Sequence, residues 1–259
     1  MKVSSFIKYS YEKFLSRTRS TTTQPAFFIK ENYKHGLRPR YFHDDEDEKK
    51  ILWQPDVYNC VQQLGRMFEC ANIIDVGCGD ATKLAPLHPN YEIFGIDYGS
   101  NIEKCRKFFP FGSWISHDLE KNEPIEFSEK ILKTSGIVCS DVIEHLVDPS
   151  FLLINLKNLL NFSSFCVLTT PERDLTRGVD HDGPPGNPFH IREWNSKELE
   201  MLLHHYGLNI ACMGLTASNN KDWEQKTIIA ILQNNTSKSL KEKWTILNRK
   251  HTKILKYFS

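Results

Sequence analysis

Hydrophobic and polar positions alternate in blocks between residues 51 and 233, and these blocks predict strands and helices in turn. Short apolar runs predict strands at 72–76, at a segment ending with Asp97, and at 114–116, 136–140, 165–169, 208–214 and 227–232. Apolar residues at helical spacing predict helices at 53–68, after Ser100, after Asp148 and at 193–206. Strands and helices that alternate in this way are typical of an α/β fold with a largely parallel sheet.

Short polar signals mark the ends of several of these helices. Ser100 followed by Glu103 predicts a capping box, and Asp148 before Pro149 predicts the start of the next helix. Gly207 predicts a helix end, because glycine adopts the left-handed conformation of a C-cap. Residues 172–188 are rich in glycine and proline and predict a long loop after the fifth strand. Loops at the carboxyl ends of parallel strands carry substrate sites, so this loop is a candidate acceptor site.

Composition narrows the class of protein. The chain has 259 residues, a hydrophobic fraction of 40%, a charged fraction of 25% and a net charge of +1. These values are ordinary for a soluble globular protein and give no general attraction to nucleic acid or to membranes. No apolar run approaches the roughly 20 residues that span a bilayer. Seven cysteines without paired spacing predict reduced core residues, which favours a cytoplasmic protein.

The two ends of the chain are expected to lie outside a domain at 51–233. Residues 1–50 form an N-terminal extension, expected to contribute acceptor-side or packing helices. The first part of this extension is basic and resembles a transit peptide in composition, so organelle targeting is the alternative to a cytoplasmic location. Residues 234–259 predict a basic, amphipathic helix that packs on the edge of the domain.

A glycine-rich turn follows the first predicted strand, in the sequence Asp75-Val76-Gly77-Cys78-Gly79-Asp80-Ala81. About twenty residues later a second strand ends in Asp97, a position suited to binding ribose hydroxyls. A carboxylate at Asp75 would repel a dinucleotide pyrophosphate, which binds to bare amide groups at a helix N-terminus. The same carboxylate suits a ligand that carries an ammonium and a sulfonium group. These residues therefore favour S-adenosylmethionine (SAM) over NAD.

The segment from Asp75 to Ala81 resembles the first motif of class I SAM-dependent methyltransferases, with Ala81 in place of the third glycine. The resemblance covers roughly residues 50 to 232. It implies a Rossmann-like fold with a seven-stranded, mostly parallel sheet, an antiparallel terminal hairpin and helices on both faces. It also implies that SAM is the cofactor.

The resemblance assigns cofactor roles to residues after the first four strands. Asp75 would hold the methionine ammonium directly or through water, and Asp97 would accept hydrogen bonds from the ribose. Tyr98 would cover the adenine, whose amino group would bind Asp118. The remaining contacts would come from the glycine turn, the Leu119 amide and the end of the fourth strand, that is, from Gly77, Cys78, Gly79, Leu119, Ser140 and Asp141.

Candidate acceptor chemistry lies in two places. An alcohol acceptor must lose its proton to a base or to a metal, and His145 and His190 are the candidate bases. Asp141, Glu144 and His145 are spaced to share one helical face. This segment resembles that of metal-using ubiquinone-pathway and small-RNA methyltransferases, whose pattern implies the ligands Asp141, Glu144, His145 and His190. Metal-free relatives share the segment, so a divalent metal is possible and is not favoured.

The loop from Asp180 to Trp194 brings polar side chains to the acceptor side. Asp180, His181, Asp182 and Arg192 are the candidate substrate contacts. The segment from His190 to Trp194 resembles the start of the corresponding helix in methyltransferases of glycan and natural-product synthesis. The sequence therefore predicts an O-methyltransferase whose partner is a small polar acceptor, such as a saccharide or glycan precursor. The alternatives are metal-assisted methylation of a catechol or an RNA 2′-hydroxyl, with nucleic acid disfavoured by charge, and a SAM-binding protein without activity.

Overall fold

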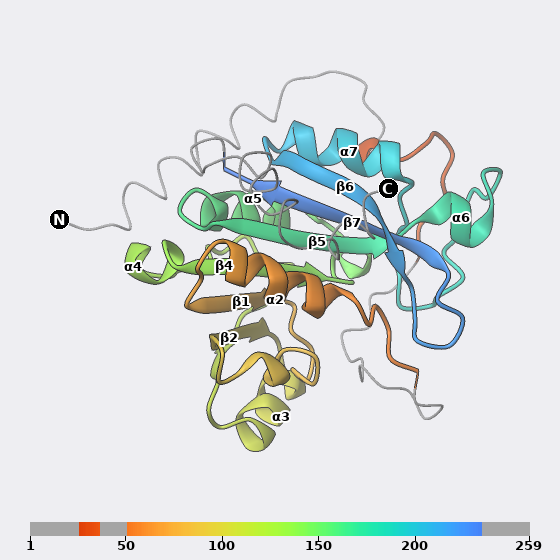
Figure 1. Cartoon of the computed structure of the whole chain (residues 1–259). Helices are drawn as coiled ribbons and strands as arrows, with labels where there is room; N and C mark the ends of the chain where they lie inside the picture. Colours follow the sequence, from red (N-terminus) through yellow and green to blue (C-terminus); the bar gives the residue numbers. More distant parts are fainter. Residues whose placement is uncertain (1–25, 37–50, 235–259) are drawn as a thin grey trace, which may run out of the picture.

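The computed structural model describes residues 26–36 and 51–234 (Figure 1). Its centre is one seven-stranded sheet in the order β3-β2-β1-β4-β5-β7-β6. The strands are β1 (Asn72–Val76), β2 (Glu92–Asp97), β3 (Ser113–Ser116), β4 (Ser135–Ser140), β5 (Phe165–Pro171), β6 (Asn209–Ala217) and β7 (Gln225–Gln233). β1 to β5 run parallel, while β7 pairs antiparallel with both β5 and β6. The predicted fold is confirmed, including the antiparallel terminal hairpin.

Two hydrophobic cores form because side chains on successive strand residues point to opposite faces of the sheet. Ile73 joins one core, which also receives residues of α2 (Val57–Met67) and α3 (Ser100–Phe108). Ile74 joins the other core, under α5 (Ser150–Leu160) and α7 (Ser196–His205). Short helices complete the chain: η1 (Ala26–Phe28), η2 (Ala85–Leu87), α4 (Glu129–Leu132), η3 (Ile143–His145) and α6 (Arg173–Arg177). Helices therefore cover both faces, as predicted.

Two helices begin later than predicted, because the residues before them pair with other segments of the chain. Trp53 forms an isolated bridge with Asn219, so the helix predicted from residue 53 begins only at Val57. Trp194 pairs with Glu172, which delays the start of α7 to Ser196. The predicted loop at 172–188 contains the short helix α6.

The predicted capping signals also had mixed outcomes. Ser100 is the first residue of α3 and makes no capping hydrogen bond, so the capping box predicted there was wrong. The box forms instead at Asn195, with Glu198 as its partner. Asp148 accepts a hydrogen bond from the Ser150 amide at 2.9 Å, at the start of α5. Gly207 follows α7 with a φ of +68°, which confirms the predicted helix end.

Residues 26–36 pack against the segment between β5 and α7. The Trp194 indole donates to the Phe27 carbonyl oxygen at 2.9 Å, and the Lys30 amide donates to Glu198 at 3.0 Å. The Gly36 amide donates to the Ile191 carbonyl oxygen at 2.7 Å. This part of the predicted extension thus contacts α7 and the loop that carries His190. The predicted transit-like segment and the C-terminal helix after residue 234 lie outside the described residues.

The seven cysteines are free in the structure, as the reduced state predicted for them requires. Across residues 26–36 and 51–234, the model contains no helix that is both long enough and apolar enough to span a membrane.

Candidate functional site

A cavity of about 500 Å³ opens at the carboxyl ends of the parallel strands. One end is lined by the residues that follow β1, β2 and β3, among them Gly77, Asp97 and Asp118. The other end is lined by His145, by His190 and by side chains of α6 and the β6–β7 turn. Parallel α/β sheets bind ligands at this edge, and a volume of this size suits a small-molecule site. The fold therefore brings the predicted cofactor residues other than Asp75, and both candidate bases, to one cavity.

The glycine turn after β1 has a backbone that other residues adopt only with strain. Gly77 and Gly79 have φ values of +84° and +57°. A Cβ atom at Gly77 would collide with the Val142 side chain, so protein packing alone requires a glycine here. Ala81 also has a positive φ, of +65°, at the position where the resembled motif has its third glycine.

Asp97 is the carboxylate that lines the cavity beside this turn. It accepts hydrogen bonds from the Gly79 amide at 2.8 Å, the Tyr98 amide at 2.7 Å and the Asn101 side chain at 3.1 Å. These contacts fix the glycine turn to the end of β2. Asn101 is a cavity residue that sequence reasoning missed, because a lone asparagine in a helix carries no distinctive signal.

The adenine-side candidates after β3 also line the cavity. Asp118 accepts a hydrogen bond from the Glu120 amide at 3.1 Å, and Leu119 lies between these two residues. Tyr98 is 48% exposed and lines the rim of the cavity. The three positions predicted around the adenine thus lie together, although β2 and β3 contribute them separately.

Asp75 is fully buried, and its carboxylate accepts a hydrogen bond from the Tyr58 hydroxyl at 2.6 Å. Tyr58 lines the cavity and Asp75 does not. The cavity therefore reaches Tyr58 rather than Asp75, and the predicted role of Asp75 toward a ligand ammonium, directly or through water, stays a prediction. Cys78 lines the cavity, and a hydrogen bond with Cys105 together with burial raises the pKa of its thiol well above the usual value.

Gln54 links three residues beneath the cavity. Its side-chain oxygen accepts hydrogen bonds from the hydroxyls of Ser140, at 2.8 Å, and Thr169. Its side-chain nitrogen donates to Asp141, whose φ is +55°. Gln54 therefore holds the ends of β4 and β5 in one arrangement. No local pattern marks this residue, because it lies in the irregular segment before α2.

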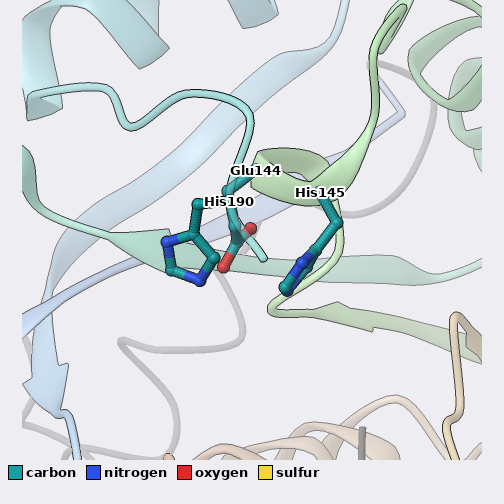
Figure 2. A group of neighbouring side chains, drawn as sticks. All are labelled: Glu144, His145 and His190. Carbon is teal, nitrogen blue, oxygen red and sulfur yellow. The ribbon is translucent and has the colours of Figure 1, made fainter. Parts of the chain in front are cut away.

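His145 has a defined tautomer when it is neutral. Its Nδ1 lies 3.0 Å from the Phe189 carbonyl oxygen, which only accepts hydrogen bonds. Nδ1 therefore carries the proton, and Nε2 carries the lone pair that a general base needs. The His145 and His190 rings meet edge to face, with centroids 4.9 Å apart (Figure 2).

His190 is held through both ring nitrogens. Its Nδ1 lies 2.7 Å from Glu193 Oε1, and its Nε2 lies 3.0 Å from the Asn187 side-chain nitrogen. The Asn187 oxygen accepts a hydrogen bond from the Phe189 amide, which turns the nitrogen of this side chain toward His190. Nε2 therefore accepts a hydrogen bond from Asn187, and Nδ1 donates to Glu193.

Glu193 is fully buried and was not among the predicted site residues. Burial raises its pKa, but the hydrogen bond from His190 and the charges of His190 and Arg177 outweigh that effect, so the net pKa is lowered. A buried carboxylate with these two partners stays ionised near neutral pH. The sequence analysis assigned the neighbouring Arg192 to the substrate instead. No local motif links Glu193 to Arg177 of α6, which lies sixteen residues earlier in the chain.

Glu144 is a fully buried acid beside His145 and His190. Its Oε2 accepts a hydrogen bond from the Thr170 hydroxyl at 2.9 Å, and its Oε1 has no hydrogen-bond partner among the described residues. Burial and the nearby Asp141 raise its pKa well above the usual value. Glu144, His145 and His190 each place a potential ligand atom within 4.8 Å of the others (Figure 2).

The predicted helical face at Asp141, Glu144 and His145 was wrong. Only Ile143–His145 form a short 3-10 helix, and Asp141 lies outside it with a left-handed backbone. The compact cluster consequently contains three of the four residues in the implied ligand set, without Asp141.

The four residues predicted to contact the substrate do not line the cavity. Asp182 forms an ion pair with Lys30 at 2.8 Å, and His181 contacts the Pro184 carbonyl oxygen at 3.0 Å. Arg192 is buried and donates to the Val147 carbonyl oxygen at 2.7 Å. Asp180 is exposed. These positions correct the prediction, because the loop folds onto residues 26–36 instead of turning its charged side chains into the cavity.

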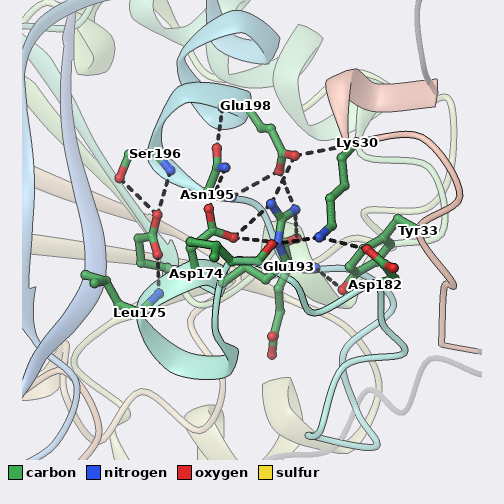
Figure 3. A network of polar contacts seen from close by, with 12 residues as sticks. Lys30, Tyr33, Asp174, Leu175, Asp182, Glu193, Asn195, Ser196 and Glu198 are labelled. Carbon is green, nitrogen blue, oxygen red and sulfur yellow. Dashed lines mark hydrogen bonds and ion pairs between the residues drawn. The ribbon is translucent and has the colours of Figure 1, made fainter.

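A buried polar network joins residues 26–36 to the residues that follow the His190 loop (Figure 3). The guanidinium of Arg173 binds Glu198 through two nitrogens, and both side chains are buried. The Tyr33 hydroxyl accepts a hydrogen bond from the Glu193 amide at 3.2 Å. The segment 26–36 thus supports the residue that holds His190.

The outer wall of the acceptor end comes from segments that the sequence did not associate with the site. α6 contributes Thr176 and Arg177. The β6–β7 turn and its neighbours contribute Trp53, Ser218, Asn219, Asp222, Glu224 and Lys226. Residues 52–54 reach this wall because they pair with residues 218–220.

Comparison with known proteins agrees with this arrangement. Residues 34–212, more than half of the chain, match the family model described as a methyltransferase domain. A probable S-adenosylmethionine-dependent methyltransferase of Mycobacterium tuberculosis is 27% identical over 159 residues, covering 60% of this chain and 55% of the relative. The chain thus spans about half the length of this curated relative.

Two solved structures share the fold. An S-adenosylmethionine-dependent methyltransferase from Clostridium acetobutylicum has a TM-score of 0.52 at 14% identity, covering 70% of this chain and 91% of that chain. The methyltransferase domain of a bacterial Hen1 has a TM-score of 0.50 at 20% identity, covering 70% of this chain and 98% of that chain. Both similarities agree with the strand order and the terminal hairpin described above.

Proposed function

Since the chain belongs to the class I SAM-dependent methyltransferases, we propose that it transfers a methyl group from SAM to a hydroxyl of a small polar acceptor, such as a saccharide or glycan precursor. One observation carries the proposal: a single cavity joins the glycine turn and Asp97 to the lone-pair nitrogen of His145. A cofactor at the first end and an acceptor at the second would meet inside it.

The residues at the first end fit SAM. When bound, SAM supplies an electrophilic methyl group on a sulfonium. Asp97 offers carboxylate oxygens for the ribose hydroxyls, and Asp118 with Leu119 offers a polar edge for the adenine. Ser140 and Asp141 line the cavity on the path toward His145, where they would border the methionine arm.

His145 is the base in this proposal. Methyl transfer is an in-line displacement, so the protein must position the acceptor oxygen and remove its proton. The Phe189 carbonyl holds His145 in the tautomer whose Nε2 accepts a proton. His190 is the less suitable base, because the Asn187 amide already binds its Nε2; its ring would border the acceptor beside His145.

The charge of the cavity favours a small acceptor over RNA. Among the described residues, seven carboxylates line it against three cations, Lys83, Arg177 and Lys226; the acids are Asp97, Asp118, Glu120, Asp141, Glu193, Asp222 and Glu224. A polyanion would be repelled by this lining, since nucleic-acid sites are usually basic. A neutral or singly charged hydroxyl compound is the better match.

A metal-assisted O-methyltransferase is the second candidate. The observation that favours it is the cluster of Glu144, His145 and His190, in which the buried Glu144 Oε1 has no hydrogen-bond partner among the described residues. The carboxylate would suit Mg²⁺ or Mn²⁺, whereas the two imidazoles favour a transition metal, so Mn²⁺ is the better match of these two ions. Such an ion would lower the pKa of an acceptor hydroxyl. Loss of activity with a chelator and its return with Mg²⁺ or Mn²⁺ would select this candidate.

The test of the first candidate uses labelled SAM with a panel of sugars, catechols and RNA ends. His145→Ala should leave SAM affinity within about twofold and reduce turnover by ~10²–10⁴, the usual contribution of a positioned base. His190→Ala should lower turnover less and raise KM. His204→Ala, on the exposed surface of α7, is the matched control. Normal turnover by His145→Ala on the best acceptor would eliminate His145 as the base.

A further inference from the structure

Most polar groups of the acceptor end already form ion pairs or hydrogen bonds within the protein. Lys226 pairs with Glu224, and Asp222 accepts hydrogen bonds from the Asn219 side chain and the Glu224 amide. The Ser218 and Thr227 hydroxyls bind each other at 3.1 Å. These partners hold the β6–β7 turn in shape and leave those groups few contacts to offer an acceptor.

Arg177, the last residue of α6, is different. Its Nε lies 3.4 Å from Glu193 Oε2, and its two terminal nitrogens have no hydrogen-bond partner in the described part of the chain. The side chain lines the cavity and is 29% exposed. It packs against Gly186, where a Cβ atom would lie 2.7 Å from the guanidinium carbon, so this glycine leaves the space that the guanidinium fills.

We infer that Arg177 binds an acidic group of the acceptor, and hence that the acceptor is a hydroxy acid bearing one carboxylate or phosphate. This inference rests on the proposed function and specifies its substrate class. The paired terminal nitrogens of a guanidinium match two oxygens of a carboxylate or a phosphate. One such group among many acids suits an acceptor with a single acidic group and opposes a polyanion.

Glu193 connects Arg177 to the histidines of the acceptor end. Its Oε2 contacts Arg177 and its Oε1 contacts His190, whose ring meets that of His145. This series of contacts places the guanidinium of Arg177 and the ring of His145 at the same end of the cavity, where one small acceptor could contact both. Trp53 lines the same end and is 40% exposed, which offers a flat surface to a ring between the two groups.

The test compares matched acceptors with labelled SAM: glucuronate against glucuronamide, glucose 6-phosphate against glucose, and 4-hydroxybenzoate against its amide. The acid of at least one pair should have a kcat/KM about tenfold or more above its neutral partner. Arg177→Gln should abolish that preference by raising KM for the acid while kcat changes little, and Arg177→Lys should restore part of it. Lys130→Gln removes an exposed positive charge on α4 and should change nothing.

The outcomes separate this inference from the proposed function. Methyl transfer with no preference for any acid, or equal losses on both members of each pair in Arg177→Gln, would show that Arg177 only neutralises Glu193. If no member of the panel is methylated, binding of the same acids is measured calorimetrically with the protein saturated in S-adenosylhomocysteine. Failure of every acid to bind there overturns the inference, whereas failure of SAM itself to bind overturns the proposed function.

Discussion

Replacement of Asp97 by alanine tests whether the end of β2 forms the ribose site. In the structure this carboxylate lines the cavity and accepts hydrogen bonds from the Gly79 and Tyr98 amides. Asp97→Ala removes the acceptor for a ribose hydroxyl and also loosens the glycine turn. Asp97→Asn keeps the size and one acceptor oxygen but removes the charge.

The expected magnitude follows from the charge of the group. A hydrogen bond to an ionised partner contributes about 1.5–3 kcal/mol, which corresponds to a loss of roughly 10- to 150-fold in SAM affinity for Asp97→Ala. Asp97→Asn should lose less, because a neutral hydrogen bond contributes about 1 kcal/mol. The loss of the hydrogen bond from the Gly79 amide should also lower the free energy of unfolding, by about 1.5–3 kcal/mol.

Calorimetric titration with SAM measures the affinity, and thermal melting shows whether each variant is folded. Glu103→Gln, at an exposed position of α3, is the control for removal of a nearby negative charge. An Asp97→Ala protein that is folded and binds SAM within twofold of the wild type would refute the ribose assignment. Tight binding of NAD in place of SAM would refute the cofactor itself.

Two further predictions concern groups behind the cavity. Tyr33→Phe should lower the free energy of unfolding by about 1–3 kcal/mol in urea titrations, because it leaves the buried Glu193 amide without its hydrogen-bond acceptor. Tyr98→Phe, at the exposed rim of the cavity, is the control. Equal stabilities of the two variants would contradict the proposed support role of Tyr33. Glu144→Gln should stabilise the metal-free protein at pH 7.5 and less so near pH 4.5, since a carboxyl with a raised pKa makes folding less favourable as pH rises above its ordinary value of 4.5. Melting temperatures with a chelator present measure this difference, and a pH-independent effect would show that the raised pKa of Glu144 does not control stability.

Local sequence patterns predicted the α/β fold and the glycine turn with Asp97 that lies at one end of the cavity. The glycine turn and Asp97 are linked by chain order, because β1, its turn and β2 follow one another and pack as neighbours. The alternation of apolar runs predicted a largely parallel sheet, and the resemblance implied helices on both faces; the structure confirms both. The interiors of β1, β4, β5 and β7 were predicted well because their side chains are buried on both faces.

The acceptor end was decided only by tertiary structure. Gln54, Glu193 and Arg177 enter the site from segments far apart in the chain, and none belongs to a local motif. Asp182 and Arg192 have the same polar character as site residues, yet Lys30 and the Val147 carbonyl bind them away from the cavity.

Local patterns record which residues suit a strand, a turn or a cap, since these depend on neighbours in the sequence. The direction in which a charged loop residue points depends instead on which distant group satisfies it on burial. For this protein the sequence by itself determined the fold and the cofactor turn. The packing of residues 26–36 and of the β6–β7 turn decided which polar groups face the acceptor.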